Sequence, residues 1–289
     1  MKRIVLRSLF ASALLYLLGL LLLPGLAVGA DFDRTHGLFG QVLAAHVREG
    51  LVDYAGLKAN RARLDSYTSA LGTVPPGELA AWKREDRFAF WINAYNAFTL
   101  KVVVDHYPIE GSWFSLYPKS SIRQIAGVWD RITFTAAGKP VTLNQIEHEI
   151  LRKQFADPRL HAAINCASIS CPELRAEPYL GDRLDAQLED GARRFAASAS
   201  RNRVDASAKS IEASQIFDWF TPDFIAAYAP GGSFAGLSGK QAAAAAFLAK
   251  FSPAAIGQAI RAGGFSVRFL SYDWSLNEAP HDGGSASSR

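Results

Sequence analysis

Residues 88–100 constrain the fold more than any other part of this chain. If they are helical, apolar side chains lie all round the helix, interrupted mainly by Asn93 and Asn96. A helix of this kind has to be buried on every side, so the stretch predicts a central helix that other elements surround. We expect this helix to cover residues 86–105.

The two asparagines are three residues apart and share one face of that helix. Their amides need partners, because an unsatisfied buried polar group costs about 1–3 kcal/mol. They can bind the backbone of a loop, such as the aromatic-rich segment 109–131. Alternatively, one amide can orient a histidine or stabilise an oxyanion, and we therefore keep Asn93 as a candidate site residue.

The remaining pattern predicts an α+β domain that is rich in helix and has a small, mainly antiparallel sheet. A capping box at Thr142 and Gln145 marks one helix start, and Pro172 suits the first position of another helix. Helices are expected at residues 36–49, 57–71, from 79, from 142 to 155, from 172, and at 184–198, 214–228 and 239–262. Strands are expected at residues 132–135, 141, 160–166, 204–212 and 265–270.

Residues 1–30 have the pattern of a secretory signal peptide. Three basic residues precede an apolar run at 9–23, and small residues lead up to Ala30. Cleavage after Ala30 is expected, which would leave no transmembrane span and place the protein in the periplasm or outside the cell. An uncleaved membrane anchor is the alternative. Residues 31–277 are expected to form one domain, followed by a disordered tail at 278–289.

The charge and composition of the mature chain exclude several partners. Without the signal it has 28 basic and 27 acidic residues, a net charge of +1. No basic patch interleaved with aromatic residues is visible, so nucleic-acid binding is not expected, and the partner would be a small-molecule or peptide substrate. The spacing of His161, Cys166 and Cys171 lacks the close ligand pairs of zinc sites. We therefore expect neither a metal nor a cofactor.

Residues 161–175 contain both cysteines of the chain. Cys166 ends an apolar run, and a strand end that leads into a turn would expose its thiol. Cys171 precedes Pro172, so it can occupy a helix N-cap, where the helix dipole favours a thiolate. Because an exported protein meets oxidising conditions, the two cysteines can also form a disulfide.

Two histidines are candidate partners for a reactive Cys166. On a straight strand, His161 and Cys166 would lie on opposite faces, about 16 Å apart, which prevents contact unless the strand is broken. His148 lies on the preceding helix, which should pack antiparallel to that strand. We therefore expect His148 to be the base, with Glu147 as an orienting acid and His161 as a rival base. A thiol, a base and an orienting group together are typical of nucleophilic acyl transfer.

Several separated segments, in the right order, resemble the DUF547 family. The resemblance covers most of residues 50–277. Its family pattern includes a histidine, a cysteine and a Glu-His pair, which map to His161, Cys166, Glu147 and His148. The matching segments are 90–96, 146–152, 161–175, 216–220 with 223–224, and 272–277.

The resemblance also bears on the choice between the two cysteines. In plant members of the family the second cysteine is commonly serine, which implies that Cys171 is dispensable and favours Cys166 as the nucleophile. By analogy, a papain-like or transglutaminase-like thiol fold would suit an α+β domain with these groups. Such an analogy concerns the fold and does not establish a function.

Two functions follow from these patterns. The first is an exported thiol-dependent hydrolase or acyltransferase that acts on peptide or amide bonds through Cys166. The second is a non-catalytic binding domain of the cell envelope. In that domain a Cys166–Cys171 disulfide would be a structural clip, and the aromatic residues around Trp113 and Trp129 would contribute a binding surface.

Overall fold

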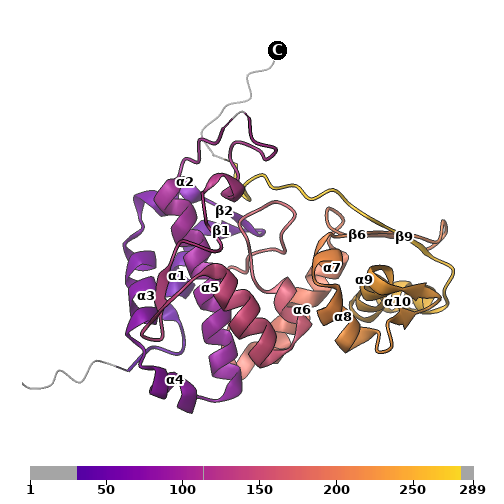
Figure 1. The fold of residues 1–289 in the computed structure, drawn as a ribbon, viewed down its shortest axis with the longest axis horizontal. Coiled ribbons are helices and arrows are strands. Elements are labelled where there is room, and N and C mark those ends of the chain that lie inside the picture. The colour runs from indigo at the N-terminus through magenta and orange to yellow at the C-terminus, as the bar shows by residue number, and fades with distance from the viewer. Residues whose placement is uncertain (1–30, 113, 281–289) are drawn as a thin grey trace, which may run out of the picture. The chain divides into compact units, whose positions relative to one another are not determined.

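The structure is a computed structural model that describes residues 31–112 and 114–280 (Figure 1). The expected signal segment and residues 281–289 of the expected tail lie outside the described residues. The helices and strands belong to one compact unit of the chain that begins at Asp33. In the described part of the chain, no helix combines the length and the apolar character that a membrane span requires.

The first part of this unit is built around one long helix, α5 (Arg84–His106). Every residue from 88 to 100 is buried, because α5 packs against α2, α3 and the helix η2. The expectation of a central buried helix is therefore confirmed. The other elements of this part are α1 (Gly37–His46), β1 (Val47–Arg48), β2 (Leu51–Val52), α2 (Tyr54–Ala59), α3 (Ala62–Thr73), α4 (Pro76–Ala81), η1 (Ile122–Gln124), β3 (Phe134–Ala136) and β4 (Lys139–Val141).

The helix η2 (Gln145–Phe155) carries two of the candidate site residues. Its capping box is confirmed: the backbone N–H of Thr142 donates to Gln145 Oε1 at 2.9 Å, and the backbone N–H of Gln145 donates to Thr142 Oγ1 at 3.2 Å. The helix winds with π-type hydrogen bonds, a rare geometry that occurs frequently at functional sites. It ends at Ala156, whose φ of 51° is left-handed.

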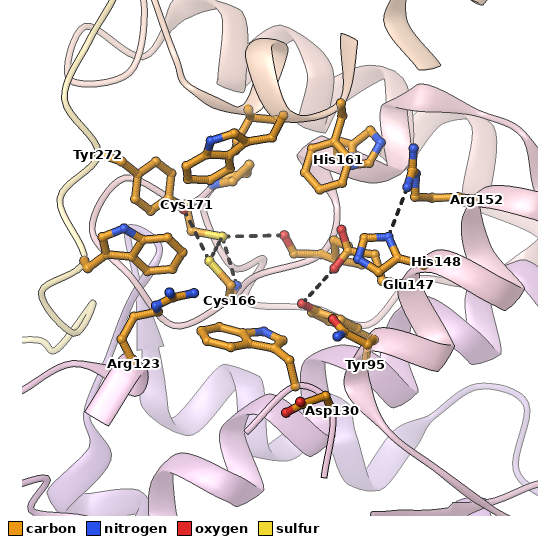
Figure 2. A pocket seen from close by; sticks show the side chains of 18 residues that line it. Tyr95, Arg123, Asp130, Glu147, His148, Arg152, His161, Cys166, Cys171 and Tyr272 are labelled. Carbon is orange, nitrogen blue, oxygen red and sulfur yellow. Dashed lines mark hydrogen bonds between the residues drawn. The ribbon is translucent and has the colours of Figure 1, made fainter. Parts of the chain in front are cut away.

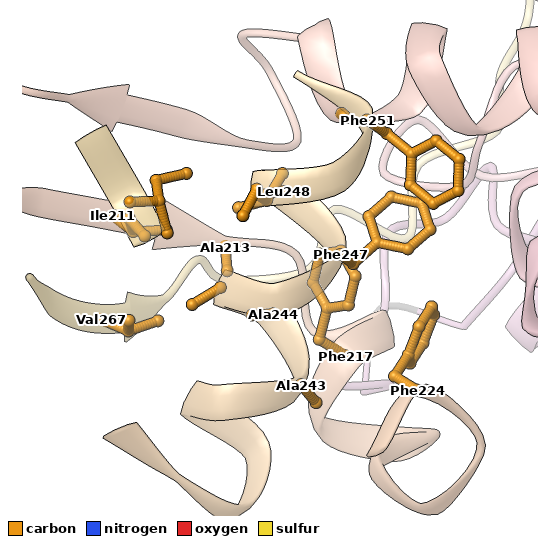
Figure 3. Close-up of a cluster of buried hydrophobic side chains, with 14 of the residues drawn as sticks. Ile211, Ala213, Phe217, Phe224, Ala243, Ala244, Phe247, Leu248, Phe251 and Val267 are labelled. Carbon is orange, nitrogen blue, oxygen red and sulfur yellow. The ribbon is translucent and has the colours of Figure 1, made fainter. Parts of the chain in front are cut away.

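The second part of the unit has a separate apolar core around α9 (Gly239–Phe251) (Figure 3). Alanines of α9 allow neighbouring elements to approach closely, and the rings of Phe217, Phe224 and Phe247 fill the space beside them. The elements here are η3 (Pro158–Ala162), α6 (Leu184–Ala197), β5 (Arg203–Asp205), β6 (Ser210–Ala213), α7 (Ile216–Trp219), α8 (Thr221–Tyr228), β7 (Ser233–Phe234), β8 (Leu237–Ser238), α10 (Ala254–Arg261) and β9 (Ser266–Phe269). The short helix η4 (Gly181–Arg183) precedes α6 and packs against α5.

The fold class agrees with the expectation of a helix-rich α+β domain. Within the described residues, however, the strands form four small sheets rather than one. The pairs β1–β2, β3–β4, β5–β6 and β7–β8 are antiparallel, whereas β6 and β9 pair in parallel. The parallel pair arises because α7 to α10 lie between β6 and β9 in the chain and return it to the same edge.

Two expectations near the cysteines are wrong. Residues 160–166 do not form a strand, because Pro158 starts the short helix η3 and the backbone beyond it is bound by the side chain of Asn96. No helix follows Pro172 either, because its carbonyl accepts from the side chain of Asn165 at 2.7 Å. Cys171 is therefore not a helix N-cap.

Three expected helices are each divided in two. Residues 57–71 belong to α2 and α3, which are separated at Asn60, whose side chain donates back to the carbonyl of Gly56. Residues 214–228 belong to α7 and α8, which meet at Phe220. Residues 239–262 likewise belong to two helices, α9 and α10, which are separated at residues 252–253.

The end of the described chain returns from β9 to the first part of the unit, as the yellow trace in Figure 1 shows. The backbone N–H of Ile169 donates to Ser275 O at 2.9 Å, and that of Val52 donates to Asn277 O at 2.9 Å. Glu278 also forms a parallel bridge with Val52. The order therefore extends past Asn277, where we expected the tail to begin.

Candidate functional site

A pocket of about 540 Å³ lies between η2, η3, the loop of residues 163–172 and the end of the described chain (Figure 2). The loop of residues 163–172 contains both cysteines and is called the cysteine loop below. Its size is within the range of about 300–1,000 Å³ that is usual for small-molecule sites. Four of the five predicted site residues line it together, namely Glu147, His148, His161 and Cys166. Asn93 is not among the lining residues.

The loop that carries Cys166 is fixed by asparagine side chains. Asn96 on α5 donates to the carbonyl of Ala163 at 3.0 Å and accepts from the backbone N–H of Asn165 at 2.8 Å. The side chain of Asn165 in turn accepts from the N–H of Ala167 at 2.8 Å. Ala167 has a left-handed φ of 58°, so the chain reverses sharply directly after Cys166.

Three groups approach the sulfur of Cys166. Cys171 Sγ lies 2.9 Å away, Ser168 Oγ 3.2 Å and the Tyr272 hydroxyl 3.3 Å. Ser168 Oγ also donates to the Tyr272 hydroxyl at 3.0 Å, which leaves the Tyr272 proton free to donate to the sulfur. The two cysteines are free thiols in the structure.

These contacts give the two cysteines different pKa values. The hydrogen bond with Cys171 is the largest cause that lowers the pKa of Cys166, and it acts against burial to bring that pKa to about 7. Burial raises the pKa of Cys171 well above its ordinary value. Of the two thiols, Cys166 is therefore the one that ionises near neutral pH, and Cys171, which keeps its proton, can donate to the Cys166 thiolate when it forms.

Glu147 is a buried carboxyl on η2 that lines the same pocket. Its Oε2 accepts from the hydroxyl of Tyr95, on α5, at 3.2 Å. Burial, and next the charge of Cys166, raise the pKa of Glu147 to about 7. Glu147 and Cys166 therefore both titrate near neutral pH, and the charge of one disfavours ionisation of the other. The carboxyl contacts Tyr95, whereas the sequence suggested that it orients His148.

The hydrogen bond of His148 fixes its tautomer. Arg152 Nη1 lies 3.0 Å from His148 Nδ1, and a guanidinium can only donate. Nδ1 is therefore an acceptor, and the neutral ring carries its proton on Nε2. Burial and then the charge of Arg152 lower the pKa of His148, which keeps the ring neutral. His148 consequently presents a donor, and not a base, at Nε2.

His161 is buried and belongs to a second hydrogen-bonded group. Its Nε2 lies 2.8 Å from Asp223 Oδ2, and Asp223 also accepts two hydrogen bonds from Arg152, at 2.6 and 2.8 Å. Burial alone would raise the pKa of Asp223, but the bonds from Arg152 and His161 outweigh it and hold that pKa well below its ordinary value. Burial lowers the pKa of His161 despite Asp223. The ring of Phe220 stacks on that of His161, with 4.0 Å between the two ring centroids.

The buried asparagines of α5 bind loop backbone, as one reading of the sequence suggested, but the loop is a different one. Asn93 donates to Tyr179 O at 2.8 Å and accepts from Tyr179 N at 2.9 Å. Asn96 binds the cysteine loop as described above. Neither contacts the segment 109–131 in the hydrogen bonds of the described residues, and both amides have partners.

Sequence reasoning missed several residues of the site. Asp223 and Tyr272 were not among the predicted site residues, yet each contacts one of those residues directly. The spacing of His148 and Arg152, four residues apart on one helix, was the available signal for their contact. In the residues that the structure describes, no group of three or more His, Cys, Asp or Glu side chains is placed to bind a metal ion.

Comparison with known proteins gives one match. No curated protein and no solved structure matches the chain. A family model described as "Protein of unknown function, DUF547" matches residues 79–196. This range includes α5, η2 and both cysteines, and it ends before Asp223 and Tyr272. The chain therefore contains a DUF547 domain of unknown function at residues 79–196.

Proposed function

We propose that this protein is a thiol-dependent hydrolase or acyltransferase that acts on peptide or amide bonds, with Cys166 as the nucleophile. The observation that carries the proposal is the environment of the Cys166 sulfur. It lines a pocket, three groups lie within hydrogen-bonding distance, and its pKa is lowered to about 7. A lowered thiol pKa inside a pocket is typical of catalytic cysteines. A papain-like or transglutaminase-like fold remains our analogy for the architecture.

The acylation step uses the charge state in which Cys166 is a thiolate and Glu147 is protonated. The Cys166 thiolate attacks the carbonyl carbon, and a C–S bond and an oxyanion form. We assign the Nε2–H of His148 as the donor to that oxyanion. The protonated Glu147 gives its proton to the leaving amine as the C–N bond breaks. The products are a thioester on Cys166, a free amine and a Glu147 carboxylate.

The second step reverses the proton movement. The Glu147 carboxylate takes a proton from water, or from an acceptor hydroxyl or amine, as that nucleophile attacks the thioester carbonyl. The C–S bond then breaks, so that the acid or the transferred acyl product leaves and the Cys166 thiolate returns. Water gives hydrolysis and another nucleophile gives acyl transfer, and the two reactions share one intermediate.

These roles differ from those that the sequence suggested. His148 was expected to be the base, but its bond from Arg152 supports a donor role. His161 was a rival base. Its contact with Asp223, which also fixes Arg152, supports a positioning role in which it keeps His148 correctly oriented. Asn93 has no role in the reaction as we propose it.

We also propose that the protein is exported and that its signal is cleaved after Ala30. The support is the pattern of residues 1–30 in the sequence. Expression of the full chain in a bacterium, followed by N-terminal sequencing of the periplasmic or secreted protein, should give Asp31 as the first residue. Recovery of the full-length chain in membranes would instead indicate an anchor.

The test of catalysis is a set of acyl p-nitroanilides incubated with the signal-free protein, some with a neutral acyl group and some, such as γ-glutamyl-p-nitroanilide, with a free carboxylate. We expect release of nitroaniline and an acyl adduct on the Cys166 peptide by mass spectrometry. Cys166→Ala should abolish both while it keeps the thermal unfolding transition. Cys171→Ser retains a hydroxyl donor and should still give the adduct. Unchanged turnover by Cys166→Ala would overturn the proposal.

The proximity of the two sulfur atoms favours a second candidate, the envelope binding domain with a Cys166–Cys171 disulfide. The atoms lie 2.9 Å apart, so the chain needs little movement to form the bond. Alkylation of the native protein without reductant distinguishes the two candidates. Rapid labelling of Cys166 that persists below pH 7 supports the enzyme. Labelling only after reduction supports the binding domain with a Cys166–Cys171 disulfide.

A further inference from the structure

Arg123 is a cation of the pocket that aromatic rings hold in place (Figure 2). Its guanidinium carbon lies 4.4 Å from the centroid of the Tyr117 ring, 4.9 Å from that of Trp274 and 5.2 Å from that of Trp129. It also donates one hydrogen bond to the Tyr117 hydroxyl. Contacts of this kind position the guanidinium before any ligand arrives.

No acidic side chain of residues 31–112 or 114–280 forms an ion pair with Arg123, although Asp130 lines the same pocket. The other arginine of the pocket, Arg152, is different, because Asp223 binds it through two hydrogen bonds. A guanidinium has five N–H donors in a planar fork that matches a carboxylate. Arg123 therefore presents most of its donors to the pocket and to solvent.

We propose that Arg123 binds a carboxylate of the substrate, and that the enzyme acts on acyl compounds that carry a free carboxylate, such as N-acylamino acids or peptides with a free C-terminus. This inference rests on the proposed thiol chemistry of Cys166. The rings of Trp129 and Trp274, which flank Arg123, would cover the apolar part of the same substrate.

The charges of the pocket favour a carboxylate over a phosphate. Within the described residues, Arg123 forms no ion pair and no lysine lines the pocket. The pocket also contains Asp130 and the Cys166 thiolate, both of which repel a dianion. A carboxylate is planar and carries a single charge, so it can accept two parallel hydrogen bonds from Arg123 and needs no second cation.

The experiment compares two alkylating reagents that differ only in charge, N-bromoacetyl-alanine and N-bromoacetyl-alaninamide. Each transfers its acylmethyl group to the Cys166 sulfur and releases bromide. We expect the wild-type protein to react faster with the acid than with the amide. The ratio of these two rates should be about tenfold higher in wild type than in Arg123→Gln. Arg123→Lys keeps the charge without the fork and should retain part of the preference.

A matched control is Arg131→Gln, which removes the same charge from a residue that does not line the pocket. It should keep the wild-type preference, and the amide reagent should label the Cys166 peptide at one rate in all variants, which shows that the pocket is intact. Equal preference in wild type and Arg123→Gln overturns the carboxylate site and leaves the thiol chemistry standing. Failure of both reagents to label Cys166 overturns the thiol chemistry and the carboxylate site with it.

Discussion

The central stretches of α5 and α9 are both buried on all sides, yet they differ in chemistry. Residues 242–249 of α9 are all apolar, with six alanines, one phenylalanine and one leucine. The corresponding stretch of α5 contains Asn93, Tyr95 and Asn96, and each makes a hydrogen bond to another segment. Both stretches fill a core, but only that of α5 also supplies side-chain hydrogen bonds; in α9 such bonds come from Lys240 and Gln241, before residue 242.

The difference teaches which part of the molecule determines the geometry of the pocket. Apolar packing is not directional, so α9 can stabilise the fold without fixing any particular loop conformation. The amide of Asn96 binds two backbone groups of the cysteine loop, and the hydroxyl of Tyr95 binds Glu147. Stability and site geometry should therefore respond differently to changes in the two helices.

The largest effect on stability is expected in α9. Phe247 is fully buried and its ring contacts those of Phe217, Phe224 and Phe251. Phe247→Ala should lower the free energy of unfolding by about 3–5 kcal/mol, measured by urea denaturation. The pH midpoint of Cys166 alkylation should remain near 7. A large shift of that midpoint would show that the apolar core also determines the site.

The next effect is expected in α5. Asn96→Leu keeps a similar volume but leaves Ala163 O and Asn165 N without partners, and should cost about 2–4 kcal/mol. Unlike Phe247→Ala, it should also slow Cys166 alkylation at neutral pH, because the loop loses its fixed conformation. Asn93→Leu is the matched control. It loses two bonds to Tyr179 and should cost a similar free energy while changing the alkylation rate less.

The smallest effect depends on pH and concerns Glu147. Its pKa is about 7 in the folded protein against an ordinary value of 4.5, so the folded state binds the extra proton. The contribution of this bound proton to the free energy of unfolding is fully present below pH 4.5 and is lost as the pH rises through 7. Glu147→Gln does not ionise, so its stability relative to wild type should increase by at most about 3 kcal/mol between pH 4.5 and pH 8.

Urea denaturation of wild type and Glu147→Gln at several pH values measures this difference. Phe247→Ala serves as the comparison, because its loss of stability should not change with pH. A difference between wild type and Glu147→Gln that is independent of pH would mean that the carboxyl has an ordinary pKa. The contact between Tyr95 and Glu147 would then have no electrostatic consequence.

The sequence was sufficient where a local signal decides the structure. The apolar pattern of residues 88–100 predicted the buried helix, and Thr142 with Gln145 predicted the start of η2. The grouping of Cys166, His148, Glu147 and His161 also follows from motifs that lie close together in the chain. Each of these inferences depends on contacts among residues that are near neighbours in sequence.

The failures occur where distant residues decide the outcome. Residues 160–166 are apolar enough for a strand, but the side chain of Asn96, about seventy positions away in the chain, binds the backbone there instead. The partner of His161 is Asp223, 62 residues later, and that of Cys166 is Tyr272, 106 residues later. No periodicity or spacing rule reaches that far, so neither contact was predicted.

The left-handed backbone of Ala167 limits which residues evolution or design can place directly after Cys166. A φ of 58° is unstrained for glycine and costs other residues about 1–2 kcal/mol. Glycine, alanine and asparagine can therefore occupy this position, whereas valine, isoleucine or threonine would force the turn to open. The acceptable residues at position 167 thus form a short list that follows from backbone geometry, independent of what the pocket binds.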